Sequence, residues 1–147
     1  MKTAIGMWML VVPWLACLGF GCKDSGSASA DPAALYAVET SPVSVQAGGT
    51  ASAQIRFAPR QGYHWNEEFP ARVRVADNPA LTLAKTEFKS GGTDFQVADG
   101  AGVLPIPVTG KTAGKTALKA TADFSMCNKD ECRIFKGIAV EVPVDVQ

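Results

Sequence analysis

Two cysteines near the end of the chain, Cys127 and Cys132, are the residues whose type and spacing best suit chemistry. Four residues separate them, in the run Cys127-Asn128-Lys129-Asp130-Glu131-Cys132. In an exported protein, a pair at this spacing is either a small structural disulfide or a redox centre that alternates between dithiol and disulfide. The other two cysteines, Cys17 and Cys22, lie in a hydrophobic N-terminal leader. The choice between these two roles is the main functional question that the residues raise.

The residues around the pair do not decide between the two roles. A disulfide that closes a loop of about six residues contributes roughly 2 kcal/mol in the chain-entropy model, near the lower end of the usual range. Lys129 and Arg133 would stabilise a thiolate, whereas Asp130 and Glu131 oppose one. The structural disulfides of immunoglobulin domains join two sheets. This pair is instead expected to link the end of a strand over 116–124 to a nearby turn, and both roles remain open.

The elements that must position the pair are predicted to be β-strands throughout. Alternation of apolar and polar residues is clearest around Ile55 and Phe57, which are predicted to share one face. Pro105 and Pro107 indicate an edge position or a bulge in their strand. Seven or more short strands separated by turn residues predict an all-β fold, an antiparallel β-sandwich. The predicted strands cover residues 35–39, 53–57, 72–75, 81–83, 103–108, 116–124 and 138–146.

Chemistry other than thiol chemistry has little support. His64 is the single histidine, and two cysteines with one distant histidine do not offer the four ligands of a zinc site. No nucleophile elbow and no phosphate-binding glycine motif are present. We therefore expect no metal and no cofactor. His64 is interpreted as a partly buried side chain at a strand start, and Glu67-Glu68 as a solvated turn.

The N-terminus predicts export. Lys2 followed by an apolar stretch to Phe20 is typical of a secretory signal and is too short and interrupted for a membrane-spanning helix. Small residues, Cys22 and a Gly/Ser-rich segment follow, which resembles a bacterial lipoprotein signal in which the cysteine is lipidated. We predict a signal over 1–21, a flexible linker with lipidated Cys22 over 22–34, and one folded domain over 35–147. An ordinary cleaved signal is the alternative.

The charge balance bears on partners. Without Lys2, 13 basic residues face 14 acidic ones, a net charge of −1. This argues against nucleic acid, which calls for a basic patch. It also argues against an electrostatic membrane-binding surface, so that the membrane would be reached through the lipid anchor only.

A family resemblance adds to this interpretation. The chain resembles the periplasmic N-terminal domain of the bacterial thiol:disulfide interchange protein DsbD and its stand-alone relatives, from roughly Val38 to the C-terminus. The most specific feature is the cysteine pair that follows a strand and precedes a short apolar strand. The segments that match in order are Gly62-Tyr63-His64-Trp65-Asn66, 70–75, Thr86-Glu87-Phe88-Lys89, 104–109, Asp123-Phe124-Ser125-Met126-Cys127, Cys132 and 140–144.

The resemblance implies an immunoglobulin-like fold and roles for particular residues. Cys127 and Cys132 would be the redox pair, with Cys132 forming the mixed disulfides. Thr86-Glu87-Phe88-Lys89 would be a cap loop, in which Phe88 shields the pair and Glu87 is a nearby acid. Tyr63 and Trp65 would be aromatic residues close to the site, although ordinary packing explains them equally well. The family often has aromatic or apolar residues and prolines after the second cysteine, whereas 133–137 reads Arg-Ile-Phe-Lys-Gly here.

The resemblance also implies partners and a location. The partners would be thioredoxin-like periplasmic proteins or a membrane thiol reductase, because the chain has no Cys-x-x-Cys motif of its own. The protein would be lipid-anchored in the envelope of a Gram-negative bacterium, facing the periplasm. Two alternatives remain: a non-catalytic binding or scaffolding lipoprotein with a structural Cys127–Cys132 disulfide, and a carrier for a small ligand beneath the Phe88 loop.

Overall fold

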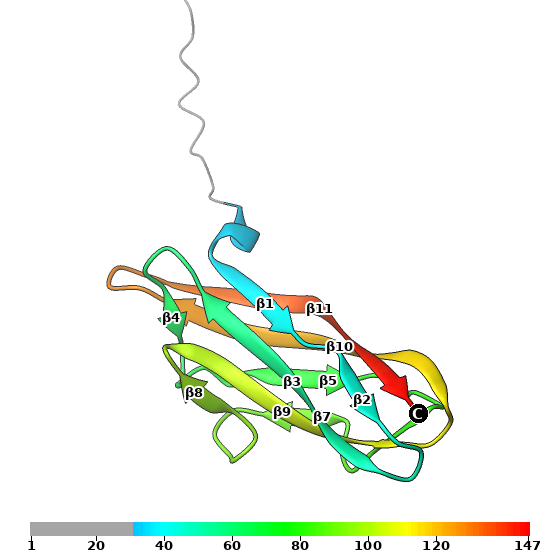
Figure 1. Cartoon of the computed structure of the whole chain (residues 1–147). Helices are drawn as coiled ribbons and strands as arrows, with labels where there is room; N and C mark the ends of the chain where they lie inside the picture. The colour runs from blue at the N-terminus through cyan, green and yellow to red at the C-terminus, as the bar shows by residue number, and fades with distance from the viewer. Residues whose placement is uncertain (1–30) are drawn as a thin grey trace, which may run out of the picture.

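The computed structural model describes residues 31–147, which form two β-sheets packed face to face (Figure 1). The five strands of the first sheet are β1 (Tyr36–Thr40), β3 (Thr50–Pro59), β9 (Ala101–Gly110) and β6 (Leu81–Leu83) in that order, with β8 (Gln96–Ala98) also paired to β9. The six strands of the second are β2 (Val43–Val45), β11 (Cys132–Val146), β10 (Gly114–Cys127), β5 (Arg72–Val75) and β7 (Glu87–Lys89), with β4 (His64–Trp65) also paired to β10. All pairings are antiparallel except that of β2 with β11.

The core lies between the sheets and follows from strand alternation. Ala53, Ile55 and Phe57 of β3 are fully buried, as the sequence pattern predicted for Ile55 and Phe57. The facing sheet contributes alternate residues of β10 and β11, because successive side chains of a strand point to opposite faces. These include Leu118, Ala120, Ala122, Phe124, Met126, Val140, Val142, Val144 and Val146. The predicted immunoglobulin-like, mainly antiparallel β-sandwich is therefore confirmed.

β9 has partners on both sides, but Pro105 and Pro107 stand where it pairs on one side only, which agrees with the predicted edge position. β9 pairs with β3 along one side. On its other side, β8 pairs with residues 101–103 and β6 with residues 108–110. Pro105 and Pro107 fall in the gap between these two short partners. A residue without an N–H group is tolerated there because no neighbouring strand needs its donor.

A bulge shapes the hairpin of β10 and β11. The register shifts between Ala122 and Phe124, whose partners are Ile138 and Phe135. Between these two pairs, β10 has one residue, Asp123, and β11 has two, Lys136 and Gly137. Gly137 has φ 67°, and its N–H donates to Asp123 Oδ1 at 2.8 Å. Because the bulge absorbs one residue, Phe135 and Ile138 both keep the core-facing side of β11.

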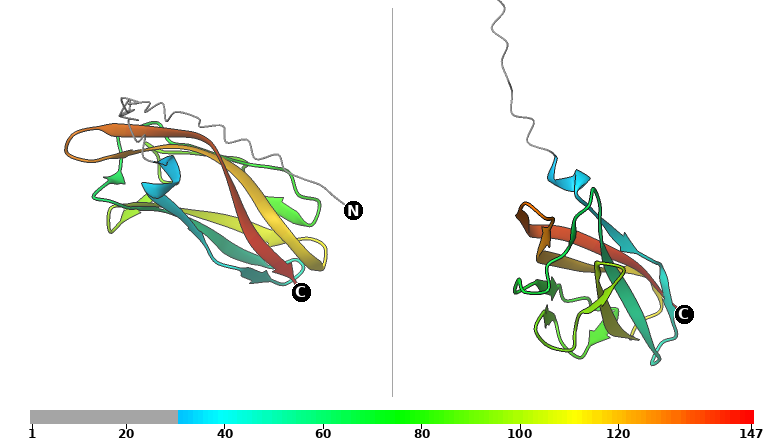
Figure 2. Two further views of the ribbon diagram at one scale, coloured as in Figure 1. Left: turned by 90° about the horizontal axis from the view of Figure 1, so that it is seen from above. Right: turned by 90° about the vertical axis from the view of Figure 1, so that its left-hand side faces the viewer.

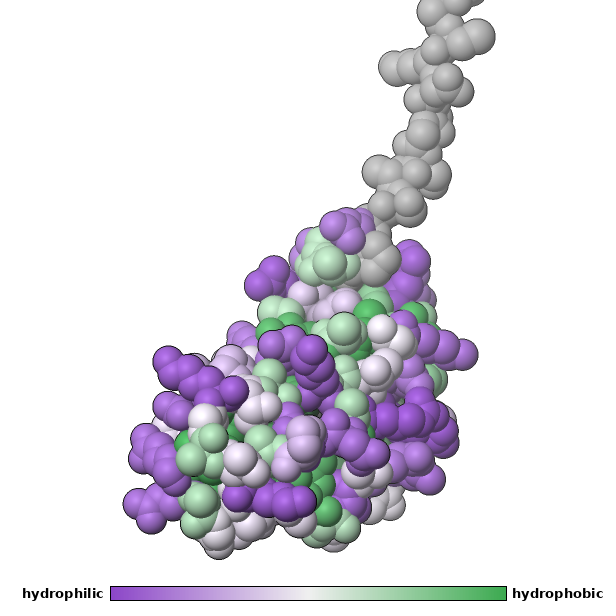
Figure 3. All heavy atoms as spheres, turned by 90° about the vertical axis from the view of Figure 1, so that its right-hand side faces the viewer, coloured by the Kyte–Doolittle hydropathy of each residue, from purple (hydrophilic) through white to green (hydrophobic). Residues whose placement is uncertain are grey.

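The hairpin tip lies at one end of the sandwich. In Figure 1 the orange hairpin projects on the left, at the same end as β4 and β8, and the C-terminus lies at the right; the left view of Figure 2 also shows the hairpin and the C-terminus at opposite ends. Figure 3 looks at the right-hand end, where hydrophilic residues cover most of the surface and hydrophobic ones form small areas between them.

Of the predicted N-terminal signal and linker, the structure describes only residues 31–34. Pro32–Ala34, expected in the flexible linker, form a short 3-10 helix, η1, and Leu35 after it is buried. The predicted signal peptide and Cys22 lie outside the described residues. Within residues 31–147, no helix is both long and apolar enough to cross a membrane.

Gly102 of β9 gives a prediction about stability, because the Trp65 ring packs where a side chain would begin. An added Cβ would lie 2.4 Å from the ring, whereas a Cβ at Gly92 would meet nothing within 4 Å. Overpacking of this kind costs about 1–3 kcal/mol. We expect Gly102→Ala to lower the free energy of unfolding by that amount in urea denaturation and Gly92→Ala to leave it nearly unchanged. Equal stability of the two variants would contradict the packing described.

Candidate functional site: a disulfide at the tip of the β10–β11 hairpin

The two cysteines form a disulfide between neighbouring strands. Cys127 is the last residue of β10 and Cys132 the first of β11, and they face each other with their Cα atoms 4.0 Å apart. The bond therefore lies within one sheet, as expected. It joins two strands, however, where the sequence predicted a link from a strand to a turn, because β10 continues three residues beyond Phe124.

The turn between the cysteines is closed by hydrogen bonds of its own. The N–H of Asn128 donates to the carbonyl of Glu131 at 2.8 Å. The Asn128 side-chain oxygen accepts the N–H groups of Asp130 and Glu131, both at 2.8 Å. Asparagine favours turns because its side chain can bond the backbone in this way. The turn thus has a closure that does not depend on the disulfide.

The two cysteines differ in accessibility. Cys127 is buried, with 8% of its surface exposed, whereas Cys132 is exposed. Both line a hollow of about 360 Å³, whose other wall is the segment from His64 to Glu68. Ile134, two residues after Cys132, is 56% exposed. A thiol arriving from solvent would therefore meet Cys132 first.

The far wall of the hollow is fixed to β10. His64 is opposite Cys127 in the register of β4 and β10. The N–H of Asn66 donates to the carbonyl of Ser125 at 3.0 Å, and its side-chain amide donates to the buried Ser125 hydroxyl at 3.5 Å. The Asn66 side-chain oxygen accepts the N–H of Glu68 at 3.1 Å. These bonds hold the Glu67-Glu68 turn at the edge of the hollow.

Two sequence interpretations can be compared with this wall. His64 is exposed and lines the hollow, so its interpretation as a partly buried side chain was wrong. It projects outward because Trp65, the next residue of β4, points into the core. Glu67 and Glu68 do form a solvated turn. Sequence reasoning did not place that turn beside the cysteines, because the pairing of β4 with β10 is a long-range contact.

An aromatic cluster in the core packs against the end of β10 that leads to the hairpin tip. Trp65 is 3% exposed and lies opposite Met126. Its ring stacks on that of Phe124, with centroids 5.8 Å apart. Phe124 also contacts three other rings, at centroid distances of 4.7–5.1 Å. These rings belong to Tyr36, Phe57 and Phe135. Sequence reasoning placed Trp65 near the site and Phe57 on the buried face of its strand, but it did not predict that these rings pack together.

Tyr63 reaches the turn of the hairpin. Its hydroxyl donates to Glu131 Oε1 at 2.5 Å, and Arg133 Nε forms an ion pair with the same oxygen at 3.0 Å. The hydrogen bond from Tyr63, together with Arg133, lowers the pKa of the Glu131 carboxyl. The same hydrogen bond raises the pKa of Tyr63. Tyr63 is therefore close to the candidate site, and its polar atom has a partner.

Phe88 and Glu87 are not brought to the disulfide. They belong to strand β7, and Phe88 is 3% exposed in the core opposite Val73, which in turn lies opposite Ala122. Ala122 precedes Cys127 by five residues, which is roughly 17 Å along a strand. The expectation of a Phe88 cap loop is therefore corrected. The apolar Phe88 side chain completes the core, which is a tertiary preference that the local sequence does not reveal.

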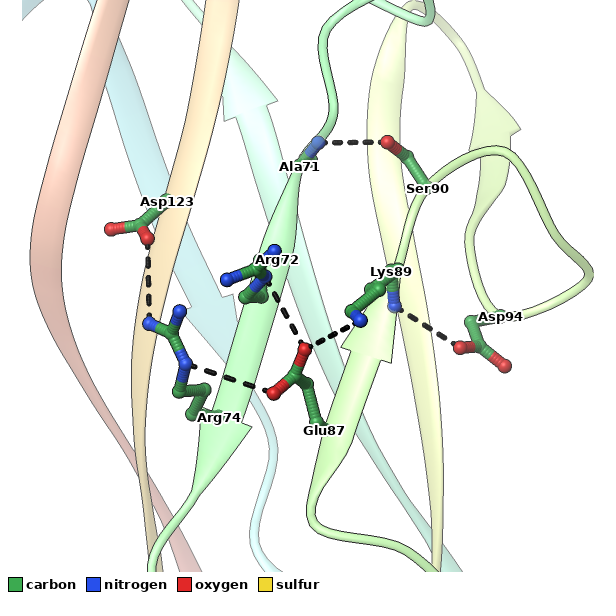
Figure 4. A network of polar contacts seen from close by, with 8 residues as sticks. All are labelled: Ala71, Arg72, Arg74, Glu87, Lys89, Ser90, Asp94 and Asp123. Atoms are coloured by element: carbon green, nitrogen blue, oxygen red, sulfur yellow. Dashed lines mark hydrogen bonds and ion pairs between the residues drawn. The ribbon is translucent and has the colours of Figure 1, made fainter.

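Glu87 takes part in a separate network on the outer face of β5 and β7 (Figure 4). Its carboxylate pairs with Arg72 at 3.3 Å, with Arg74 at 3.8 Å and with Lys89 at 2.9 Å. Lys89, followed by Arg72 and Arg74, lowers the pKa of the Glu87 carboxyl. Arg74 also pairs with Asp123 of β10 at 3.6 Å. The role of Glu87 in the structure is to join strands.

A different loop, over residues 90–95, approaches the site. Phe95 stacks on Trp65 with the ring centroids 5.4 Å apart. Asp94 holds the loop by accepting the N–H of Lys89 at 3.1 Å (Figure 4) and by an ion pair with Lys85. A second hollow, of about 330 Å³, lies between this loop and Trp65 and shares Glu67 with the first. Gly91 and Gly92 suit a turn, but nothing in the sequence tied this loop to the cysteines.

Comparisons with known proteins identify no family for this chain. No family model matches the chain, and no curated protein matches it. Solved structures with similar folds include domains 4 and 5 of the S-layer protein SbsC (16% identity, TM-score 0.38), murine CRIg (11%, 0.40) and a type I cohesin–dockerin complex from Clostridium thermocellum (14%, 0.43). These matches cover 76%, 76% and 77% of the chain, and 44%, 98% and 95% of the matched chains. The chain thus spans less than half of the S-layer structure. In residues 31–147, no group of three or more His, Cys, Asp or Glu side chains is placed to hold a metal ion.

The contact between Tyr63 and Glu131 gives a prediction about titration. Tyr63→Phe removes the hydrogen bond that contributes most to the lowered pKa of Glu131. We expect that pKa to rise toward its usual range in an NMR titration of the side-chain carboxyl. The pKa of Glu131 rises because the lost hydrogen bond stabilised its ionised form. Tyr36→Phe is the control. It removes the hydroxyl of a tyrosine in the aromatic cluster, whereas the hydroxyl bonded to Glu131 is that of Tyr63, so the titration of Glu131 should not change.

Proposed function

We propose that this protein exchanges thiols and disulfides with a partner through Cys127 and Cys132. The observation that supports the proposal is the disulfide at the rim of an open hollow, with one cysteine buried and the other exposed. Disulfides that act only as staples gain nothing from exposure to other thiols, and labile ones are characteristically strained or exposed. The resemblance to the N-terminal domain of DsbD points in the same direction.

The exchange proceeds in two displacement steps. A thiolate of a reduced partner attacks Cys132 Sγ, the partner–Cys132 bond forms, and Cys127 leaves as a thiolate that then takes up a proton. A second thiolate of the partner attacks the partner's own sulfur in the mixed disulfide and releases Cys132. The partner has then lost two electrons and become a disulfide, and this protein has gained them as a dithiol. The relative reduction potentials set the direction, and the reverse sequence transfers electrons outward.

The surrounding residues keep the exchange site in place. Asn66 and Ser125 fix the wall opposite the disulfide, and the aromatic cluster beneath Trp65 fixes the end of β10. The hydrogen bonds of Asn128 preserve the turn when the S–S bond opens. The hairpin can therefore stay closed in the dithiol form, which keeps the two sulfurs near each other for reoxidation.

The proposal includes partners and a location. The partners are thioredoxin-like periplasmic proteins or a membrane thiol reductase, which supply or remove the two electrons. The location is the envelope of a Gram-negative bacterium, with attachment through lipidated Cys22 and the folded domain facing the periplasm. No cofactor is required, because the electrons travel as thiol pairs.

The alternative is a binding or scaffolding lipoprotein in which the disulfide is a staple. The observation in its favour is that the bond closes the tip of the longest hairpin and joins strands that already pair directly. The two functions differ in reduction potential, since structural disulfides lie below roughly −300 mV and exchange proteins lie at roughly −120 to −270 mV.

The first test is the reduction potential of the Cys127–Cys132 pair in the folded domain. The domain is equilibrated with glutathione or dithiothreitol buffers, and free thiols are trapped and counted by mass. We expect a value within the range of exchange proteins and reduction without prior unfolding. A value well below that range, with reduction only in denaturant, would favour the structural role.

The second test separates the two cysteines. In Cys127→Ser the exposed Cys132 can still attack the disulfide of an oxidised partner, and the mixed disulfide accumulates because Cys127, which resolves it when electrons flow outward, is gone. We expect this variant to accumulate mixed disulfides with periplasmic thiol proteins in cells, detected on non-reducing gels and by mass spectrometry. Cys132→Ser is the matched control and should accumulate several-fold less, because Cys127 is buried. Equal trapping by both variants would contradict the assigned roles.

A further inference from the structure

The charges around the disulfide are unevenly balanced. On the hairpin, Lys129 pairs with Asp130 at 3.8 Å and Arg133 pairs with Glu131 at 3.0 Å. Across the hollow, Glu67 and Glu68 are exposed, and among residues 31–147 no ion pair or hydrogen bond involves either carboxylate. The rim therefore presents two uncompensated negative charges to anything that approaches the sulfurs.

These two charges act on the species that performs the exchange. The attacking form of any thiol is the thiolate, which is an anion. Two like charges about 6 Å apart near a surface repel each other weakly in water, and roughly 0.1 M salt screens part of the repulsion. At that separation each carboxylate would slow a singly charged thiolate by about twofold. A thiol with a second negative charge is slowed more, and one with a neighbouring ammonium group escapes the effect.

We infer that Glu67 and Glu68 make the Cys127–Cys132 disulfide selective for thiols set among positive charges. The protein partner that fits is one whose reactive cysteine is flanked by lysine or arginine side chains, which would lie against the Glu67-Glu68 turn. Small anionic thiols such as glutathione are disfavoured by the same turn. This inference rests on the proposed thiol–disulfide exchange and adds the charge of the partner to it.

Two features support a role in selection over an accidental surface charge. The turn is fixed by bonds from Asn66 to Ser125 and to the N–H of Glu68, so the backbone that carries the two carboxylates stays at the hollow. Glu67 also lines the neighbouring hollow beside Phe95, so its charge faces both openings at this end of the sandwich. Because the hairpin's charges neutralise one another in pairs, the net negative charge at the rim comes from the Glu67-Glu68 turn.

The test compares three small thiols that differ in the charge of the attacking form. The thiolate of cysteamine is neutral overall, that of 2-mercaptoethanol carries one negative charge, and that of 3-mercaptopropionate carries two. Rates of opening of the native disulfide are measured by acid quench and mass spectrometry for the wild type and the double variant Glu67→Gln/Glu68→Gln. The ratio of variant to wild type cancels the intrinsic reactivity of each thiol.

We expect the ratio to be near one for cysteamine, about fourfold for 2-mercaptoethanol and larger for 3-mercaptopropionate at about 0.1 M salt. In about 1 M salt the three ratios should converge, because the screening length falls to about 3 Å. The wild type alone offers a second measurement, since added salt should accelerate 3-mercaptopropionate more than cysteamine.

Glu141→Gln is the matched control, because it removes the same charge from an exposed position on β11. Glu141 lies nine residues beyond Cys132, roughly 30 Å along the strand, and should leave all three rates unchanged. Equal ratios for the three thiols, or the same pattern in Glu141→Gln, would overturn the inference while leaving the proposed exchange intact. If 2-mercaptoethanol opens the native disulfide in none of these proteins, both the proposed exchange and the inferred charge selectivity would be wrong.

Discussion

The packing of Phe124 at the centre of an aromatic cluster is the contact on which the candidate site depends. Its ring touches rings from β1, β3, β4 and β11, so the cluster joins both sheets at one end of the sandwich. Aromatic pairs of this kind contribute about 0.5–1.5 kcal/mol each beyond the burial of their surface. β4 is only two residues long, and Trp65 is its buried anchor. The cluster therefore holds β4 against β10 and places the wall of the hollow beside Cys127, three residues beyond Phe124.

The site combines this rigid base with an exposed tip. Cys127 closes the buried part of β10, whereas Cys132 begins the exposed part of β11. The bulge at Gly137 separates the tip from the long regular part of the hairpin and keeps Phe135 in the core. A disulfide on such a tip can open without disturbing the core, because the turn has its own hydrogen bonds. The same arrangement makes accessibility, and not loop closure, the property that distinguishes this disulfide from the inter-sheet disulfides of immunoglobulin domains.

Charges have different roles in different parts of the molecule. Glu87 and Asp123 are neutralised by arginines and a lysine that cross between β5, β7 and β10. Exposed pairs of this kind contribute little to stability individually and mainly fix which strand edges meet. At the rim of the hollow, the carboxylates of Glu67 and Glu68 have no such partners in the part of the chain that the structure describes and would repel an approaching thiolate. The overall charge of the chain is near zero, so any electrostatic preference arises from this local distribution and not from the net charge.

The sequence by itself determined the class of fold and the chemistry that is possible. Alternation around Ile55 and Phe57 and the spacing of turn residues were enough for a β-sandwich, because a half-buried strand must bury every second residue. The count and positions of the cysteines were enough to single out Cys127 and Cys132. Only the tertiary structure decided what surrounds them. The sequence indicated a strand start at His64, but not that this two-residue strand, β4, pairs with β10. That pairing brings His64 and the Glu67-Glu68 turn to the disulfide. Phe88, which the family resemblance placed over the cysteines, instead packs in the core, because burial of an apolar ring depends on the whole sandwich and not on its neighbours in the sequence.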